Sequence, residues 1–247
     1  MFSGDRIFPV AGCALLLLIV ALIVNVVCSA SFSDKSPFER DEVEEYLTDL
    51  NDNETEVIGA AASSIIVDSF VGPLAGIAGY LLFRQRQRLL ATTFLGFLLV
   101  GAAVSLVADA VGIGNLIIAK DFADGGPAGI AAGDSTITEV GRALGMTQFA
   151  LTQAGFSAIS VAILALGALI SFAPERGVVP PRWIGWLLVL SGVSGLLGWI
   201  VVVADFGFVF FIIAGLSQLI GLASLGVWLL RSRDKEVAMM AGAAAPA

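Results

Sequence analysis

Apolar residues occupy long uninterrupted runs along this chain, and charged residues mark where most of the runs end. Six runs reach the roughly 20 residues that a helix needs to cross the hydrocarbon core of a bilayer. A crossing segment must satisfy its own backbone hydrogen bonds, so each run predicts a helix. The expected spans are 9–31, 57–83, 89–118, 144–173, 183–204 and 206–230. The pattern therefore predicts an all-α fold, a polytopic integral membrane bundle of six transmembrane helices.

The polar stretch between the first two spans has a different pattern. Ser36-Pro37-Phe38-Glu39 is a capping box with proline at the first helical position. Apolar residues then recur at three- and four-residue spacing, at Val43, Tyr46, Leu47 and Leu50. We expect the acidic outer loop 34–56 to contain a short amphipathic helix on the membrane surface or over the bundle. A solvated acidic loop is the alternative, because short helices are marginal unless they are packed.

The composition supports the membrane interpretation and narrows the chemistry. Apolar side chains make up 57% of the chain and charged ones 14%, outside the range of a soluble domain. Without any histidine, the chain cannot supply His-ligated haem, zinc or copper, or a Ser-His-Asp or Cys-His triad. Cys13 and Cys28 would lie roughly 22 Å apart on one helix, too far for a disulfide. We therefore expect no catalytic residues, no cofactor, no metal site and no enzyme.

The loop charges predict an orientation, because short cytoplasmic loops are rich in Lys and Arg. Of the 13 basic residues, nine lie near the two termini and in the loops after the second and fourth spans. The other face holds four basic residues against fifteen acidic ones, about −11 in net charge. We expect both termini to be cytoplasmic and the outer face to be acidic. A signal peptide is the alternative for the first span, but its apolar stretch exceeds the usual 7 to about 15 residues, so we expect it to be retained.

Two aspartates lie inside predicted spans, Asp68 in the second and Asp109 in the third. An ionised carboxylate at the centre of a bilayer costs about 2.5 to 3.5 kcal/mol on the insertion scale. No lysine or arginine lies inside any predicted span, so an intramembrane ion pair is not available. Protonation, hydrogen bonds or a bound cation must compensate.

Four polar residues are predicted at similar depth. Each follows or precedes an outer charge by about the same distance, which places all four roughly 16 to 20 Å into the membrane. They are Asp68, Asp109, Gln153 and Gln218, on the second, third, fourth and sixth spans. Pro73 cannot donate to the carbonyl of Ser69, so the second span should be kinked, with a free carbonyl acceptor beside Asp68. Together these groups form a candidate proton or cation site.

Three interpretations of the aspartates remain open. They could be protonated residues that hydrogen-bond across helices and stabilise packing, and this is the interpretation we favour from the sequence. They could form the proton or cation site. An intramembrane aspartyl protease also places two aspartates on adjacent helices, but the tyrosine-aspartate and Gly-x-Gly-Asp contexts of that class are replaced here by Ile66-Val-Asp68 and Val107-Ala-Asp109.

Small residues recur at three- and four-residue spacing on two spans. These are Gly72, Gly76 and Gly79 on the second, and Ser191, Gly192, Ser194, Gly195 and Gly198 on the fifth. Rows of this kind allow close backbone approach between membrane helices. We expect them to serve packing within the chain.

The junction of the fourth and fifth spans runs from Leu169 through Pro174, Pro180, Pro181 and Arg182 to Trp183 and Leu187. It resembles the DUF4386-like group of uncharacterised six-span prokaryotic membrane proteins, where a Pro-Arg-Trp step opens the fifth helix. The resemblance covers about twenty residues in addition to the span count. It implies a six-span fold in a prokaryotic plasma membrane, and it implies no activity.

The expected organisation is one transmembrane domain over residues 1–235, followed by a disordered tail over 236–247. The expected partners are the lipid bilayer and, as an open alternative, other membrane subunits, with no nucleic acid. The leading functional hypothesis is a non-enzymatic structural or accessory membrane protein. The alternative is a small proton- or cation-coupled transporter or channel that uses Asp68 and Asp109.

Overall fold

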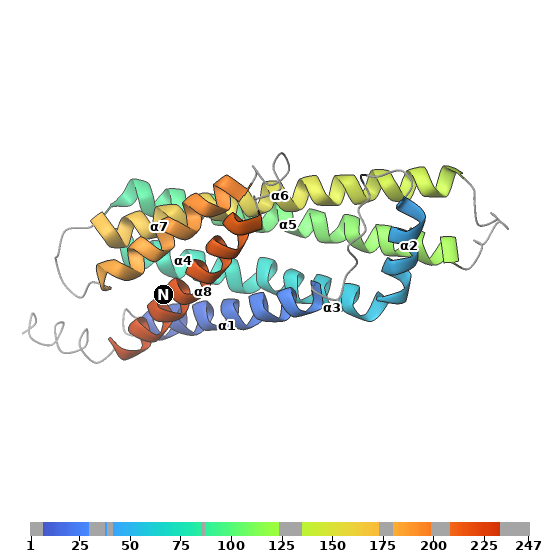
Figure 1. Cartoon of the computed structure of the whole chain (residues 1–247). Coiled ribbons are helices and arrows are strands. Elements are labelled where there is room, and N and C mark those ends of the chain that lie inside the picture. The colour runs from blue at the N-terminus through green and yellow to red at the C-terminus, as the bar shows by residue number, and fades with distance from the viewer. Residues whose placement is uncertain are drawn as a thin grey trace, which may run out of the picture. The chain divides into compact units, whose positions relative to one another are not determined.

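The computed structural model describes residues 7–29, 38, 42–84, 87–123, 135–172, 180–198 and 208–232. Every regular element in these ranges is helical, which confirms the all-α prediction for the described residues (Figure 1). In chain order the elements are α1 (Ile7–Ser29), α2 (Val43–Asp52), α3 (Glu54–Ile66), the π-helical turn η2 (Val67–Val71), α4 (Gly72–Phe83), α5 (Arg88–Ala123), α6 (Ser135–Phe172), α7 (Arg182–Leu197) and α8 (Phe208–Arg231).

Four described helical stretches are long and apolar enough to cross a membrane. They are Glu54–Phe83, Arg88–Ala123, Thr136–Phe172 and Val209–Arg231, which correspond to the second, third, fourth and sixth expected spans. The described apolar parts of α1 and α7 are shorter, at Phe8–Val20 and Arg182–Leu197. A count of six is therefore not confirmed. The expected end of the fifth span and the predicted tail 236–247 lie outside the described residues.

The chain divides into two compact units, and each is assembled from segments that are distant in sequence. Unit 1 contains residues 1–20, 70–102 and 156–247, and unit 2 contains residues 21–69 and 103–155. Asp68 and Asp109 therefore fall in the same unit. The single domain expected over 1–235 stays a prediction.

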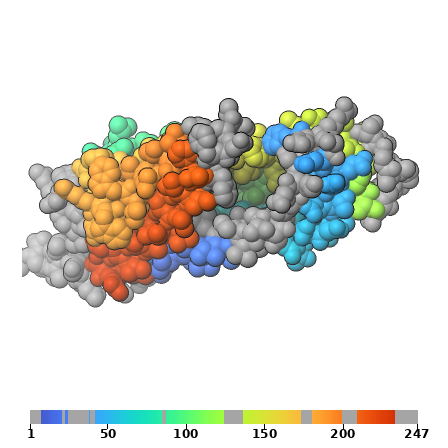
Figure 2. Space-filling model, viewed as in Figure 1, coloured from blue at the N-terminus to red at the C-terminus, as the bar shows by residue number. Residues whose placement is uncertain are grey.

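Unit 1 is held together by apolar side chains and by close helix contacts at small residues. Leu166 of α6, Leu188 of α7 and Leu225 of α8 are among its fully buried side chains. A Cβ atom added to Gly167 would lie 2.6 Å from the backbone nitrogen of Val189, so α6 and α7 touch backbone to backbone. Figure 2 shows α7 and α8 side by side, and the Ser191 hydroxyl of α7 donates a hydrogen bond to the Ala214 carbonyl of α8 at 3.0 Å. The expected close approach at the small residues is seen at Gly192, where an added Cβ would lie 2.7 Å from the backbone nitrogen of Leu164.

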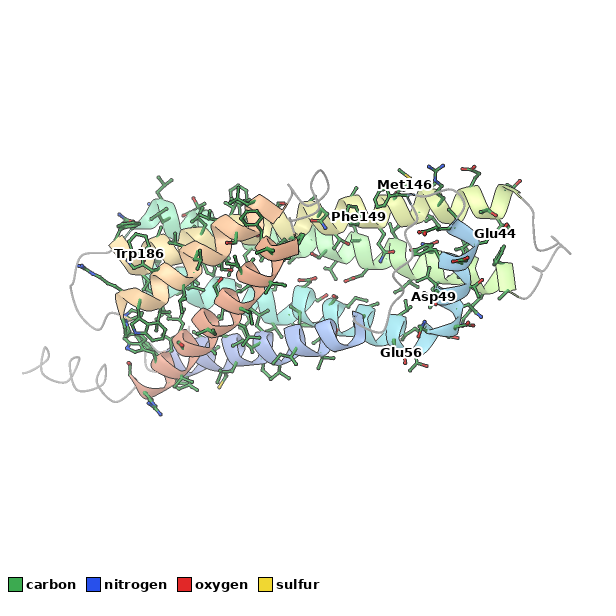
Figure 3. The ribbon with its side chains drawn as sticks, viewed as in Figure 1. Glu44, Asp49, Glu56, Met146, Phe149 and Trp186 are labelled. Carbon is green, nitrogen blue, oxygen red and sulfur yellow. The ribbon has the colours of Figure 1, made fainter. Side chains whose placement is uncertain are left out.

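Unit 2 contains the short helix α2, which lies across α5 and α6 (Figure 1). Val43 and Leu47 of α2 are fully buried with Ala119 of α5, and Leu47 also packs against Gly141 of α6. The opposite side of α2 is acidic, with Glu44 exposed (Figure 3). The amphipathic helix is confirmed, and the solvated loop is wrong for residues 43–52, because Val43 and Leu47 gain their stability by burial against α5 and α6. The capping-box residues Ser36, Pro37 and Glu39 lie outside the described residues.

Candidate functional site

The helix that carries Asp68 changes its winding at that residue. Residues Val67–Val71 form a π-helical turn between α3 and α4, and Asp68 is the second residue of that turn. Pro73 follows in the first turn of α4. Proline has no N–H to donate, so the regular ladder of hydrogen bonds cannot continue through this point. The regular winding is thus interrupted at Asp68, close to the predicted kink, and π turns inside α-helices are frequent at functional sites.

Asp68 and Asp109 both lie in unit 2. Both side chains are half-buried, and their carboxyl groups are close enough to interact electrostatically. The Oδ2 atom of Asp109 is buried and has no hydrogen-bond partner among the described residues. A buried carboxylate oxygen without a partner loses its hydration and gains nothing in return. A proton on Asp109 or a cation beside it would remove that cost.

A groove of roughly 340 Å³ lies between α3 and α5 in unit 2. The Glu54 carboxylate and the Lys120 ammonium form an ion pair at one end of it. Its remaining lining is apolar and consists of Ile58, Ala61, Ala62, Ile65, Ile113, Leu116 and Ile117.

The helix faces that line this groove also carry the two aspartates. Asp68 follows Ile65 by three residues, and Asp109 precedes Ile113 by four. Residues three or four apart on a helix share a face, so each aspartate lies one turn beyond the last groove residue of its helix. The groove thus runs from the Glu54–Lys120 ion pair toward the carboxyl pair.

Sequence reasoning missed a second polar contact in unit 2. Asn115 is fully buried on α5, and its side-chain amide donates a hydrogen bond to the Tyr46 hydroxyl of α2 at 2.8 Å. Burial raises the pKa of Tyr46 above its ordinary 10.0, and the hydrogen bond from Asn115 lowers it by less. An asparagine inside an apolar span is itself a signal of a required partner, and that signal could have identified Asn115.

The two predicted glutamines occupy different units. Gln153 is half-buried on α6 in unit 2, and Gln218 is half-buried on α8 in unit 1. The glutamine that packs against α5 is Gln148, whose amide lies against Gly112, where an added Cβ would come within 2.5 Å. Gln148 lies five residues before Gln153 on α6, so a depth estimate alone did not select it. The four-residue layer stays a prediction.

The α2 end of unit 2 gathers charged side chains, as Figure 3 shows for Glu44, Asp49 and Glu56. Arg142 of α6 lies 3.7 Å from the Glu139 carboxylate and donates a hydrogen bond to the Phe38 carbonyl at 3.4 Å. Within the described residues, no group of three or more His, Cys, Asp or Glu side chains is placed to hold a metal ion. The aspartate pair offers the chemistry of a proton or of a singly charged cation.

Comparison with known proteins gives one match. The family model for a Domain of unknown function (DUF4386) matches residues 10–232. Neither the curated proteins nor the solved structures include a match to this chain.

Proposed function

This chain belongs to the DUF4386 family, whose description assigns no function, and from its own residues we propose that it is a non-enzymatic membrane protein that moves protons or small cations. The proposed site is the carboxyl pair of Asp68 and Asp109 in unit 2. The observation that carries the proposal is the buried, unpartnered Oδ2 of Asp109 within electrostatic range of Asp68. We therefore prefer transport to the accessory role that the sequence favoured.

The energetics of the pair support a bound proton or cation. Two ionised carboxylates in a membrane repel each other, and each loses hydration. Sharing a proton or holding a cation cancels the repulsion and gives the buried oxygen a partner. A group whose occupancy can change in this way is suited to coupling, because binding and release switch the charge of the site.

The winding of the helix at Asp68 also supports this proposal. A π turn leaves backbone carbonyl groups less regularly bonded than an α-helix does, so they can serve as additional oxygen ligands. Transporter sites commonly use interrupted membrane helices for this purpose. In the proposed orientation, with both termini cytoplasmic, the acidic α2 end faces outward in a prokaryotic plasma membrane and concentrates cations there.

The test is ion flux in proteoliposomes that contain the full chain. Wild type is compared with Asp68→Asn and Asp109→Asn at equal reconstitution, under proton, sodium and potassium gradients. Asp134→Asn is the matched control, since it removes one carboxylate from the acidic stretch between the third and fourth spans. We expect ion flux with wild type and with the control variant. Either site variant should abolish it. Absence of wild-type flux, with both site variants folding normally, would overturn the proposal.

A structural or accessory role is the second candidate. It is favoured by α2, which is docked on α5 and α6 through Val43 and Leu47 while Glu44 and Glu45 are exposed. That arrangement leaves an acidic helix face for a basic partner subunit. If flux is absent, co-purification of a membrane partner that Glu44→Gln/Glu45→Gln loses would support this role.

A further inference from the structure

The α3–α5 groove is apolar along its length, and its two charged lining residues, Glu54 and Lys120, lie at one end. Its walls are isoleucine, leucine and alanine side chains, and Ile58, Ile65 and Ile117 are partly exposed on its rim. An aqueous path for hydrated ions would need polar walls, which this groove does not have between Glu54 and Ile65. The groove therefore suits an apolar solute better than water.

The size of the groove fits a small molecule. Its volume of roughly 340 Å³ lies at the lower end of the range for small-molecule sites, about 300 to 1,000 Å³. Its apolar rim belongs to helices with the length and composition of membrane spans. A hydrophobic solute dissolved in the bilayer could thus enter from the side.

The charge at the end of the groove selects the solute. Asp68 and Asp109 lie one turn beyond Ile65 and Ile113, and Asp109 has the unpartnered Oδ2. A single positive charge beside these carboxyl groups is attracted strongly, because the surroundings have a low dielectric constant. An anion there would be repelled, and a neutral molecule would not offset the negative charge of the carboxyl groups.

We propose that the α3–α5 groove binds a lipophilic cation, whose apolar body lies between α3 and α5 and whose positive charge lies at Asp68 and Asp109. This rests on the proposed cation site at Asp68 and Asp109 and extends its substrates beyond small cations to organic ammonium or phosphonium ions. The apolar body gains by burial, at about 25 cal/mol per Å² of apolar surface in general. The carboxyl pair makes binding depend on charge, which distinguishes the site from an ordinary lipid contact.

The test is equilibrium binding of radiolabelled tetraphenylphosphonium to the full chain in lipid nanodiscs. The anion tetraphenylborate has nearly the same shape and serves as the probe of opposite charge. We expect saturable binding of the cation to wild type. Asp68→Asn or Asp109→Asn should weaken the affinity at least about tenfold, because the attracting charge is reduced. The anion should show no saturable binding.

Groove-filling variants test the apolar half of the site without touching a carboxylate. Ala61→Phe, with Ala62→Phe as a second filler, should abolish cation binding, because both positions line the groove. Ala103→Phe is the matched control, since Ala103 is exposed on α5 and does not line the groove. Circular dichroism and gel filtration establish that each variant folds.

Three results would overturn the inference. They are equal binding of the cation and the anion, undiminished binding in both filled variants, and no saturable binding to wild type. Equal binding of both probes would indicate a lipid-tail groove. If the cation fails to bind but inorganic flux still requires Asp68, the proposed function survives without this substrate class. If flux is also absent, both proposals fail together.

Discussion

Asn115 of α5 donates its side-chain amide to the hydroxyl of Tyr46 on α2 at 2.8 Å, and the two residues are 69 positions apart. Asn115 is fully buried, and its Oδ1 atom has no partner among the described residues. The amide nitrogen therefore depends on Tyr46. This one hydrogen bond joins the amphipathic helix to a helix of transmembrane length.

Tyr46→Phe should lower the stability of the chain by about 1 to 3 kcal/mol, because it leaves a buried amide without an acceptor. Asn115→Leu combined with Tyr46→Phe should be less destabilising than the two single costs added together, since no buried polar group is then orphaned. Unfolding in mixed micelles, followed by circular dichroism, measures both. Additive costs would show that the hydrogen bond contributes nothing to stability.

The same contact predicts a pH dependence at the alkaline end. The pKa of Tyr46 is raised above 10.0 by burial, so the neutral phenol is the form favoured by the fold. Its contribution to stability is complete below about 10 and is lost as pH rises through the raised folded pKa. In a Tyr80→Phe background, Tyr46 is the only tyrosine, and phenolate absorbance should show a midpoint above 10.0. Adding Asn115→Leu should raise the midpoint further, and a midpoint at or below 10.0 would contradict this environment.

Gly167→Ala should destabilise unit 1 by about 1 to 3 kcal/mol, because the new methyl group meets the backbone of α7. The backbone nitrogen of Val189 would be 2.6 Å away and the carbonyl of Gly185 2.7 Å away. Gly96→Ala is the matched control, since a Cβ there meets nothing within 4 Å and alanine favours a helix. Thermal unfolding of both variants checks this prediction. Equal midpoints would mean that α6 and α7 are not in backbone contact.

The ion pair between Lys120 and Glu54 should contribute little to stability. Their side chains are 42% and 39% exposed, and exposed ion pairs contribute less than about 1 kcal/mol. We expect Lys120→Met and Glu54→Gln each to change the unfolding free energy by less than Tyr46→Phe does. A larger loss in the micelle titration would show that the pair is held by the membrane or by a ligand.

Pro73→Ala should separate stability from transport. Alanine restores a backbone donor, so the π turn at Val67–Val71 can return to α-helical winding with a gain of up to about 3 kcal/mol. That change turns Asp68 relative to Asp109. We expect a higher unfolding midpoint together with reduced cation flux in proteoliposomes. Unchanged flux in a stabilised variant would mean that the site does not need the π turn.

The predictions from sequence were most successful where a local pattern has one physical solution. The apolar runs specify helices because a chain in lipid must satisfy its backbone hydrogen bonds within each segment. The three- and four-residue spacing of Val43 and Leu47 specifies the buried face of α2. Pro73 specifies the irregularity beside Asp68, since its missing donor is a property of the residue itself.

The partners of buried polar groups could not be predicted in the same way. Depth along each helix predicts that Gln153 belongs with Asp109, and that stays a prediction. Depth did not point to Gln148, which lies against Gly112 of α5, because rotation about the helix axis decides which side chain faces a neighbour. The contact between Asn115 and Tyr46 crosses 69 residues and has no local signal that names the pair. Depth along a helix is a one-dimensional measure, whereas contact between two side chains depends on their positions in three dimensions.

The sequence by itself indicated apolar, membrane-like surroundings and the helical elements. It also showed that the chain has no histidine and that two carboxylates lie in apolar spans, where their charge must be neutralised. Tertiary structure alone decided that Asp68 and Asp109 lie in one unit within electrostatic range, while Gln218 lies in the other unit. It also decided that an apolar groove lies between α3 and α5, with Glu54 and Lys120 at one end. The physical reason is that hydrophobicity and hydrogen-bonding capacity belong to each residue. The pairing of faces depends on how whole helices pack.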